Sequence, residues 1–446
     1  MPSCTITSHI VLSSALMGAR ASAIVVPGWP YQGFQSFPSM FFGANASGLD
    51  SHEQLEQVAR YQLPGWGWQV GMSTRWPTNG GYPPAGGGQL PSSYSFDSSA
   101  LLHQNVKNLR AVRAEAGGVQ PPLSGGVFVY RNADLAVWYN NVSGREAYRS
   151  HPDHFAHSRN GSLCWYMVDG GPVTNFSLPA AVDYWLANTV QELCEQKAAG
   201  GADAVFWDGV DDAGGSRGEP NASFAVTNCS WGSFDPHWSS EAGRLAIFNA
   251  HAAAFVRAGR KLNACGVWPI LSLGSAMNLG IAKARGMPAT DELFLSSLDA
   301  AGVKWARFYE FWGWNSAGYW IENALQFSRR GIPMVMHCAG PGPNGPDDIL
   351  MAVASFLVVQ TNYSYFGCSG GAKLGNNVWT DPGWIWHPFY DEKPGHPLGP
   401  AVYDAKAQTL TRIFQAAVVT LGGCDTLNTC KTANISMATG RRYLRR

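Results

Sequence analysis

The sequence predicts an α/β fold in which eight strands alternate with helices and close into a (β/α)8 barrel, followed by a β-hairpin extension. Short apolar runs recur between segments whose apolar residues are three and four positions apart, which is typical of strands alternating with helices. The glycine-rich first turn of a nucleotide-binding open sheet is absent. We therefore prefer a barrel over an open sheet, and its length of 446 residues suits one large barrel.

The expected strands are eight apolar runs that follow one another along the chain. They are Met40–Gly43, Trp66–Val70, Gly126–Tyr130, Ala204–Trp207, Trp268–Leu271, Trp305–Tyr309, Pro333–Met336 and Tyr363–Phe366. Glycine and tryptophan dilute the pattern in the second run. Eight such runs over more than 300 residues are the number that a closed barrel requires.

Amphipathic helices are expected between these runs. Three segments carry an apolar stripe at helical spacing, and their stripe residues are Leu102, Val106, Leu109 and Val112, then Val182, Leu186, Val190 and Leu193, then Leu245, Phe248, Ala252 and Phe255. Further helices are expected over residues 319–330 and 347–360. Each stripe would cover the outside of the sheet.

The chain divides into three expected parts: a signal peptide over residues 1–23, a catalytic barrel over 24–400, and an extension over 401–446. In the extension, Val418–Leu421 and Thr429–Ile435 are expected to form a hairpin around a Gly-Gly-Cys turn. The basic segment Arg441–Arg446 is expected to be a solvated tail.

Secretion is expected from three features. The apolar run Ile10–Ala19 precedes the small-residue motif Ala21–Ala23, as in a cleavable signal peptide, and it is too short to span a membrane. Acceptor motifs for N-glycosylation occur at Asn45, Asn141, Asn160, Asn175, Asn221, Asn228, Asn362 and Asn434. Without Cys4, eight cysteines remain, and we expect disulfides between Cys424 and Cys430 and between Cys338 and Cys368.

Composition narrows the class of partner. The formal net charge is zero and only 14% of residues are charged, so the attraction to phosphate that nucleic-acid binding needs has no source. Eighteen Trp, sixteen Tyr and twenty-one Phe are more aromatic residues than a core usually needs, and aromatic rings suit the apolar faces of sugars. We expect an oligosaccharide or polysaccharide substrate, a monomer, and neither a metal nor another cofactor.

Two acidic residues stand where a barrel presents reactive groups, at the carboxyl ends of strands. Asp208 ends the fourth expected strand and Glu310 ends the sixth, each between aromatic residues. Hydrolysis of a glycoside needs one ionised carboxylate and one protonated carboxyl group facing each other. Asp208, beside a glycine turn, suits the ionised role, and Glu310, beside Tyr309 and Trp312, suits the protonated one. Alternatively, Asp208 caps a helix, and Glu310 pairs with a nearby arginine, Arg307 or Arg131.

Other residues follow the same strand ends and are candidates to bind sugar hydroxyl groups or stack on sugar rings. The candidates are Tyr130, Arg131, Trp207, Asp212, Arg307, Trp312, His337 and Tyr365, with Asn45 and Gln69 as further ones. For His337, a histidine satisfied in the core is the commoner alternative.

The segment GADAVFWDGVDD, with the later TNYSYFG and PLGP segments, resembles a largely uncharacterised family of TIM-barrel glycoside hydrolases. It is more distantly similar to barrels of the endo-polygalactosaminidase and α-galactosidase kind. The resemblance implies that Asp208 is the nucleophile of a retaining glycosidase and that a second acid serves as acid/base. Some relatives take that acid from the fifth strand, but Trp268–Ser272 has none, which favours Glu310.

Two other motifs and one other function are alternatives to this interpretation. Gly367–Gly371 matches the G-x-S-x-G motif of serine esterases around Ser369, but glycine- and asparagine-rich sequence follows where a helix is needed. His151–His157 gathers groups that bind metals, but Pro152 disfavours a helix and we expect a solvated loop. A barrel that binds carbohydrate without hydrolysing it is the alternative to a glycosidase.

Overall fold

The structure is a computed structural model that describes sixteen segments of the chain. They are residues 51–59, 61, 63–66, 98–115, 126–133, 147–157, 161, 165–166, 171–208, 241–272, 296–312, 321–339, 346–361, 364–369, 388–427 and 430–445. The expected signal peptide, the expected first strand Met40–Gly43 and Asp212 lie outside these residues.

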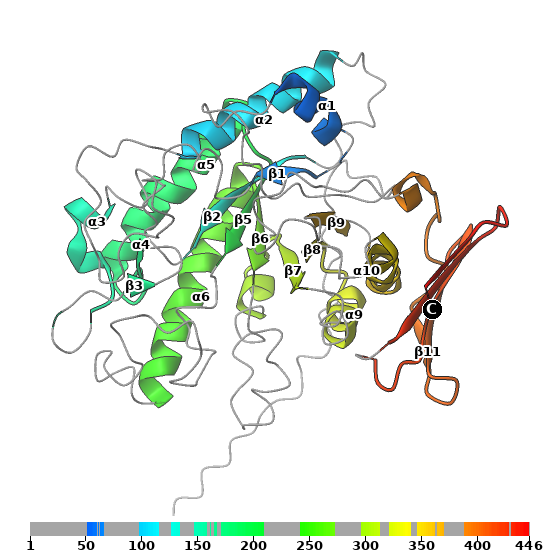
Figure 1. Cartoon of the computed structure of the whole chain (residues 1–446). Coiled ribbons are helices and arrows are strands. Elements are labelled where there is room, and N and C mark those ends of the chain that lie inside the picture. Colours follow the sequence, from blue (N-terminus) through cyan, green and yellow to red (C-terminus); the bar gives the residue numbers. More distant parts are fainter. Residues whose placement is uncertain are drawn as a thin grey trace, which may run out of the picture.

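Seven parallel strands form one sheet in the order β1-β2-β5-β6-β7-β8-β9 (Figure 1). Their bounds are β1 Gly65–Trp66, β2 Phe128–Asn132, β5 Ala204–Asp208, β6 Trp268–Ser272, β7 Ala306–Trp312, β8 Met334–Ala339 and β9 Tyr365–Ser369. These are the second to eighth expected strands, and neighbours in sequence are neighbours in the sheet. A parallel sheet with helices between its strands fits an α/β fold of the TIM type.

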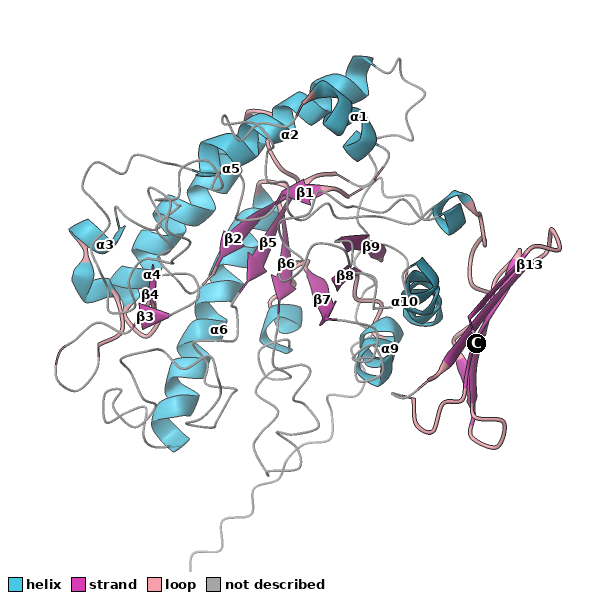
Figure 2. Cartoon of the chain, in the orientation of Figure 1, coloured by secondary structure: helices cyan, strands magenta, loops and turns pink. Residues whose placement is uncertain are grey.

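Helices flank this sheet (Figure 2). The expected helices are present as α2 Ser98–Glu115, as α4 Pro179–Trp185 continued by η3 Leu186–Val190 and α5 Gln191–Ala198, as α6 Glu241–Ala264, as α9 Ile321–Arg329 and as α10 Pro346–Val359. A further helix, α1 His52–Ala59, was not expected from the sequence. None of the helices in these described parts has the length and apolar character needed to cross a membrane.

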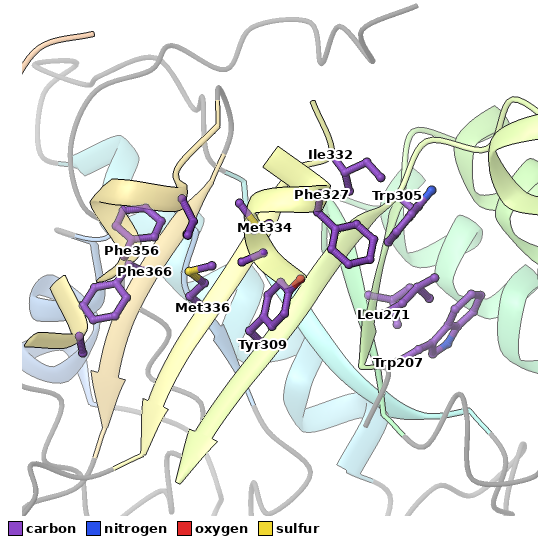
Figure 3. Packing of buried hydrophobic residues seen from close by; sticks show 14 of the residues in the cluster. Trp207, Leu271, Trp305, Tyr309, Phe327, Ile332, Met334, Met336, Phe356 and Phe366 are labelled. Carbon is purple, nitrogen blue, oxygen red and sulfur yellow. The ribbon is translucent and has the colours of Figure 1, made fainter. Parts of the chain in front are cut away.

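One set of alternate strand residues packs against the helices. Trp207, Leu271, Tyr309 and Met336 belong to the same buried cluster as Phe327 of α9 (Figure 3). Side chains of a strand alternate between the two faces of its sheet, so the residues between these belong to the opposite face.

The opposite face of the sheet is lined by aromatic rings. The rings of Phe206 in β5 and Phe308 in β7 lie 4.3 Å apart between centroids, although β6 lies between their strands. Neighbouring strands are about 4.8 Å apart, so strands two positions apart in a flat sheet are separated by about twice that distance. The contact therefore indicates that this face is concave, as the inside of a barrel is. Phe128 and Tyr130 of β2 also contact Phe206 on this face.

A second sheet follows the parallel one and packs on α10 (Figure 1). Its antiparallel strands are β10 Val402–Asp404, β11 Thr409–Ile413, β12 Ala417–Gly422, β13 Thr432–Met437 and β14 Arg442–Arg445. The expected hairpin strands correspond to the paired β12 and β13, but the sheet has five strands rather than two. The expectation of a solvated basic tail was wrong, because β14 pairs with β13.

Arg412 of β11 joins the second sheet to α10. Its guanidinium donates hydrogen bonds to the backbone carbonyls of Leu357, Val358 and Gln360, at distances of 3.1, 3.2 and 2.6 Å. These carbonyls lie at the carboxyl end of α10, where a helix leaves acceptors without partners and carries partial negative charge. A buried arginine therefore caps α10 from the second sheet.

Two disulfides lie in the described parts of the chain. The bond between Cys424 and Cys430 confirms the expected pair that closes the turn between β12 and β13. Cys194 of α5 is bonded to Cys265, just beyond α6, across 71 residues. Cys338 and Cys368 are backbone partners in β8 and β9, but their side chains lie outside the described residues, so this expected bond stays a prediction.

Candidate active site

Asp208 is the last residue of β5 and is half-buried. Its Oδ2 accepts a hydrogen bond of 3.0 Å from the phenol of Tyr130. Its backbone carbonyl accepts a 2.8 Å hydrogen bond from the amide of Ala133, and its backbone is paired with Asn132. The carboxylate is thus held at the carboxyl end of two neighbouring strands, the position that barrels use for chemistry.

Asn132 extends this contact into a chain of hydrogen bonds. Its Nδ2 donates to the Tyr130 phenol at 3.4 Å, and the phenol in turn donates to Asp208. Tyr130 and Asn132 are both buried, which restricts the positions that the phenol can take. Asn132 was not among the residues predicted from the sequence, although it ends its strand two residues after Tyr130 and so falls on the same face.

Glu310 lies within β7, where its backbone is paired with His337 of β8. It is two positions beyond Phe308, whose ring belongs to the concave face. The side chain of Glu310 is outside the described parts, as is that of Trp312 at the end of the same strand. The expected convergence of Asp208 and Glu310 therefore stays a prediction.

His337 and Tyr365 are buried. The His337 ring stacks near the Phe308 ring, with centroids 6.5 Å apart. The backbone of Tyr365 in β9 is paired with Val335, which precedes His337 by two positions in β8. Full burial of His337 agrees with the alternative of a histidine satisfied in the core.

Trp207 does not reach the concave face, which corrects its expected stacking on sugar rings. Its indole is fully buried on the helix side, with centroids 5.4 Å from Trp185 and 5.1 Å from Phe255. The reason is strand alternation, because Trp207 is adjacent to Asp208 in β5 and therefore turns to the other face. Its role is packing between the sheet and the helices (Figure 3).

Arg131 is likewise on the helix side and fully buried, which corrects its expected contact with sugar hydroxyl groups. Its guanidinium donates to the Tyr130 carbonyl at 2.9 Å and lies 3.5 Å from Glu192 and 3.4 Å from the His103 ring. Burial, followed by the charge of Arg131, lowers the pKa of His103 to about 2, so this histidine is neutral. Arg131 thus joins β2 to α2 and α5, and Glu192 is its carboxylate partner.

Arg307 is the third correction of this kind. Its guanidinium is buried over the rings of Tyr309 and Phe327, at 5.0 and 5.5 Å from their centroids. Burial raises the pKa of Tyr309 above its usual value, so the phenol stays protonated beside this cation. Arg307 therefore joins β7 to α9 instead of lining the concave face.

The remaining candidates are not decided by the described residues. Asp212 lies outside them, and for Ser369 only the backbone at the end of β9 is described. What the structure brings together is Asp208, Tyr130 and Asn132 beside the aromatic concave face. A half-buried carboxylate at the carboxyl end of a parallel strand, in an α/β fold of the TIM type, is a candidate catalytic acid. Closure of the sheet into an eight-stranded barrel stays a prediction.

No family model and no curated protein matches the chain. Among solved structures it is similar to the glycoside hydrolase domain of PelA from Pseudomonas aeruginosa, with a TM-score of 0.39, 10% identity, and 79% of this chain and 98% of that chain covered.

Two further solved structures are Aspergillus fumigatus Ega3 in complex with galactosamine and a Cellulomonas fimi endo-β-1,4-mannanase of glycoside hydrolase family 26. Ega3 has a TM-score of 0.37 and 11% identity, with 82% of this chain and all of that chain covered. The mannanase has a TM-score of 0.36 and 10% identity, covering 92% and 93%. A protein described as a sugar phosphate isomerase/epimerase is also similar. Glycoside hydrolases are thus among the similar structures.

Proposed function

We propose that this protein is a secreted glycoside hydrolase that cleaves O-glycosidic bonds with two carboxylates. The observation that supports the proposal most is the position of Asp208. It is half-buried at the carboxyl end of a central strand, and a buried tyrosine donates a hydrogen bond to it. A carboxylate oriented in this way can attack an anomeric carbon.

In the proposed mechanism, Asp208 is the nucleophile and Glu310 is the acid/base. Glu310 gives its proton to the leaving oxygen while Asp208 forms a bond to the anomeric carbon, which yields a covalent glycosyl intermediate. Glu310 then removes a proton from water, which attacks the same carbon and releases Asp208 with net retention. Glu310 is two residues beyond Phe308 in β7, and strand alternation favours the concave face for it.

The substrate in this proposal is an oligosaccharide or polysaccharide bound by a monomer. With Trp207, Arg131 and Arg307 assigned to packing and His337 to the core, the remaining candidate sugar contacts are Tyr130, Asp212, Trp312 and Tyr365. Trp312 is proposed as the stacking surface, since a tryptophan next to the acid/base would place a sugar ring at the reacting bond.

The direct test is to incubate the purified protein with a panel of oligosaccharides and polysaccharides and to measure released reducing ends. Proton NMR of the first product would then show which anomer forms, with retention expected. Inversion would contradict the nucleophilic role of Asp208. Measurable binding with no hydrolysis of any substrate would favour a carbohydrate-binding barrel, and labelling of Ser369 by a phosphonate would favour an esterase.

Replacing Tyr130 with Phe is expected to lower kcat about ten- to a hundredfold, with little change in KM. The substitution removes the hydrogen bond to Asp208, and hydrogen bonds to charged groups contribute about 1.5–3 kcal/mol. Steady-state kinetics of both proteins would test this. The control is Tyr443→Phe in β14, which removes a phenol bonded to Glu392 and should leave kcat unchanged. Equal kcat values for Tyr130→Phe and the original chain would contradict a role for the phenol.

For the secretory route, we expect Asn175 to carry an N-linked glycan. It lies in a turn, where its Oδ1 accepts hydrogen bonds from the backbone amide and the hydroxyl of Ser177, at 3.1 and 2.5 Å. The acceptor side chain is therefore already placed beside the hydroxyl of its motif at the surface. Peptide mapping after enzymatic glycan release in heavy-oxygen water would mark the modified asparagine. An unmarked Asn175 in protein from a eukaryotic secretory host would refute this expectation.

A further inference from the structure

The segment that follows β2 contains a short helical turn built around histidines. It comprises α3 Ala147–Ser150 and the 3-10 helix η2 Pro152–His154. A solvated loop was expected here from the sequence, because proline disfavours the interior of an α-helix. In the structure Pro152 takes the first position of the turn, where its fixed φ is favourable and its missing N–H costs nothing.

The 3-10 geometry places the two histidines of this turn one above the other. Residues three apart are eclipsed in such a helix, and the backbone amide of His154 donates to the carbonyl of His151 at 3.0 Å. The imidazole rings of His151 and His154 are accordingly stacked, with centroids 4.6 Å apart and planes only 8° apart. Both rings pack edge-on against Tyr184 of α4, at 4.7 and 5.6 Å.

The turn is held at both ends by the surrounding structure. Phe155 is buried and packs with Ala147 and Tyr184. The amide of Asn175 donates to the carbonyl of His154, and the amide of Ala156 donates to the carbonyl of Val173, at 2.9 and 2.8 Å. The histidine pair is thus supported before any ligand binds.

Three donor groups of this turn converge. One ligand atom from each of His151, Asp153 and His154 lies within 4.8 Å of the others. Independently, the Nδ1 of His154 is shielded from solvent, and within the described residues no hydrogen-bonding group reaches it. A buried ring nitrogen without a protein partner is unfavourable, and a bound ion or water commonly satisfies such a group.

We propose that His151, Asp153 and His154 bind one divalent transition-metal ion of the Zn2+ kind. Two imidazole nitrogens and one carboxylate are a donor set that Zn2+ takes, with bonds of about 2.0–2.2 Å, so two donors on one ion are at most about 4.4 Å apart. Binding therefore needs the donor atoms to move slightly closer and the two stacked imidazoles to rotate out of parallel, because each ring nitrogen donates in the plane of its ring. Asp153 is exposed and able to turn inward. The imidazoles disfavour Ca2+ and Mg2+, which take oxygen donors. The ion would fix the turn against α4.

The test uses full-length protein without a histidine tag, stripped with EDTA and dialysed. Titration with Zn2+ against a chromophoric chelator is expected to show one ion bound per chain. His154→Ala and Asp153→Asn should each weaken binding by at least about tenfold, because even groups that only support a metal ligand are worth 10- to 100-fold in affinity. His157→Ala is the matched control, since this nearby histidine contacts the Phe155 carbonyl outside the cluster, and it should bind as the original chain does.

A second measurement, the Tm with and without Zn2+, distinguishes loss of metal binding from misfolding of a variant. Zn2+ should raise the Tm of the original chain and of His157→Ala, but not that of His154→Ala, because an ion that binds only the folded protein stabilises it. Asp153→Asn, at an exposed position, should keep the circular dichroism spectrum unchanged. Failure of the original chain to bind Zn2+ at millimolar concentration, or equal weakening by His157→Ala, would overturn the proposal. Neither outcome depends on hydrolysis of a glycoside.

Discussion

Replacing Asp208 with Asn is expected to lower the rate of glycoside hydrolysis by about a thousandfold or more, the scale seen when a nucleophile is removed. An amide keeps the size of the carboxyl group but neither attacks the anomeric carbon nor stabilises positive charge there. The Tyr130 phenol can still donate to the amide oxygen at this position. We therefore expect the fold, and the affinity for the sugar, to be nearly unchanged.

The measurement is single-turnover and steady-state kinetics on whichever substrate the panel reveals, together with ligand affinity by calorimetry. Asp404→Asn is a suitable control, because Asp404 lies at the exposed edge of the second sheet. Full activity in Asp208→Asn would exclude Asp208 as nucleophile. Loss of binding together with activity would assign Asp208 to holding the sugar instead.

Replacing Asp203 with Ala is expected to have the opposite effect, lowering stability by about 2–4 kcal/mol with hydrolysis retained. Asp203 lies just before β5 and accepts hydrogen bonds from Arg110 at 2.9 Å, from the Val127 amide at 2.8 Å and from the Lys197 ammonium. These side chains are only 19–28% exposed, so Arg110 and Lys197 would lose their partner in a poorly solvated site. We expect a smaller loss of stability than for a fully buried ion pair, because water still screens part of the interaction.

Urea unfolding followed by circular dichroism would give the free energy of unfolding of each protein. The matched control is Asp425→Ala, which removes the partner of Lys431 in an exposed ion pair, and it should change stability by no more than about 0.5 kcal/mol. Equal stability of Asp203→Ala and Asp425→Ala would show that the interactions at Asp203 contribute nothing beyond a surface pair.

Asp203 and Asp208 lie at opposite ends of one strand, β5. In barrels the amino end of a strand serves stability and the carboxyl end serves chemistry. Asp203→Ala and Asp208→Asn separate these two roles although the residues are only five positions apart. The first should change the free energy of unfolding, and the second should change the rate of glycoside hydrolysis.

Strand alternation explains why the candidate site was predicted only in part. Strand ends are visible in the sequence, and this rule selected Tyr130 and Asp208, which the structure joins by a hydrogen bond. The same rule also selected Arg131 and Trp207, which are adjacent to them and face the helices. A residue shares a face with another residue of its strand only when the two are an even number of positions apart. Applied from Asp208, this rule excludes Trp207. Applied from Tyr130, it excludes Arg131 and selects Asn132.

Local spacing was enough for the order of strands and helices and for the disulfide that closes a turn between Cys424 and Cys430, six residues apart. These features depend on residues near one another in the chain, whose periodicity is set by backbone geometry. The disulfide between Cys194 and Cys265, the burial of Arg307 under α9 and the packing of His151 and His154 against Tyr184 needed the folded chain. Each depends on packing between segments distant in sequence. The periodicity of one segment shows which of its faces is buried, but not which other segment packs against that face.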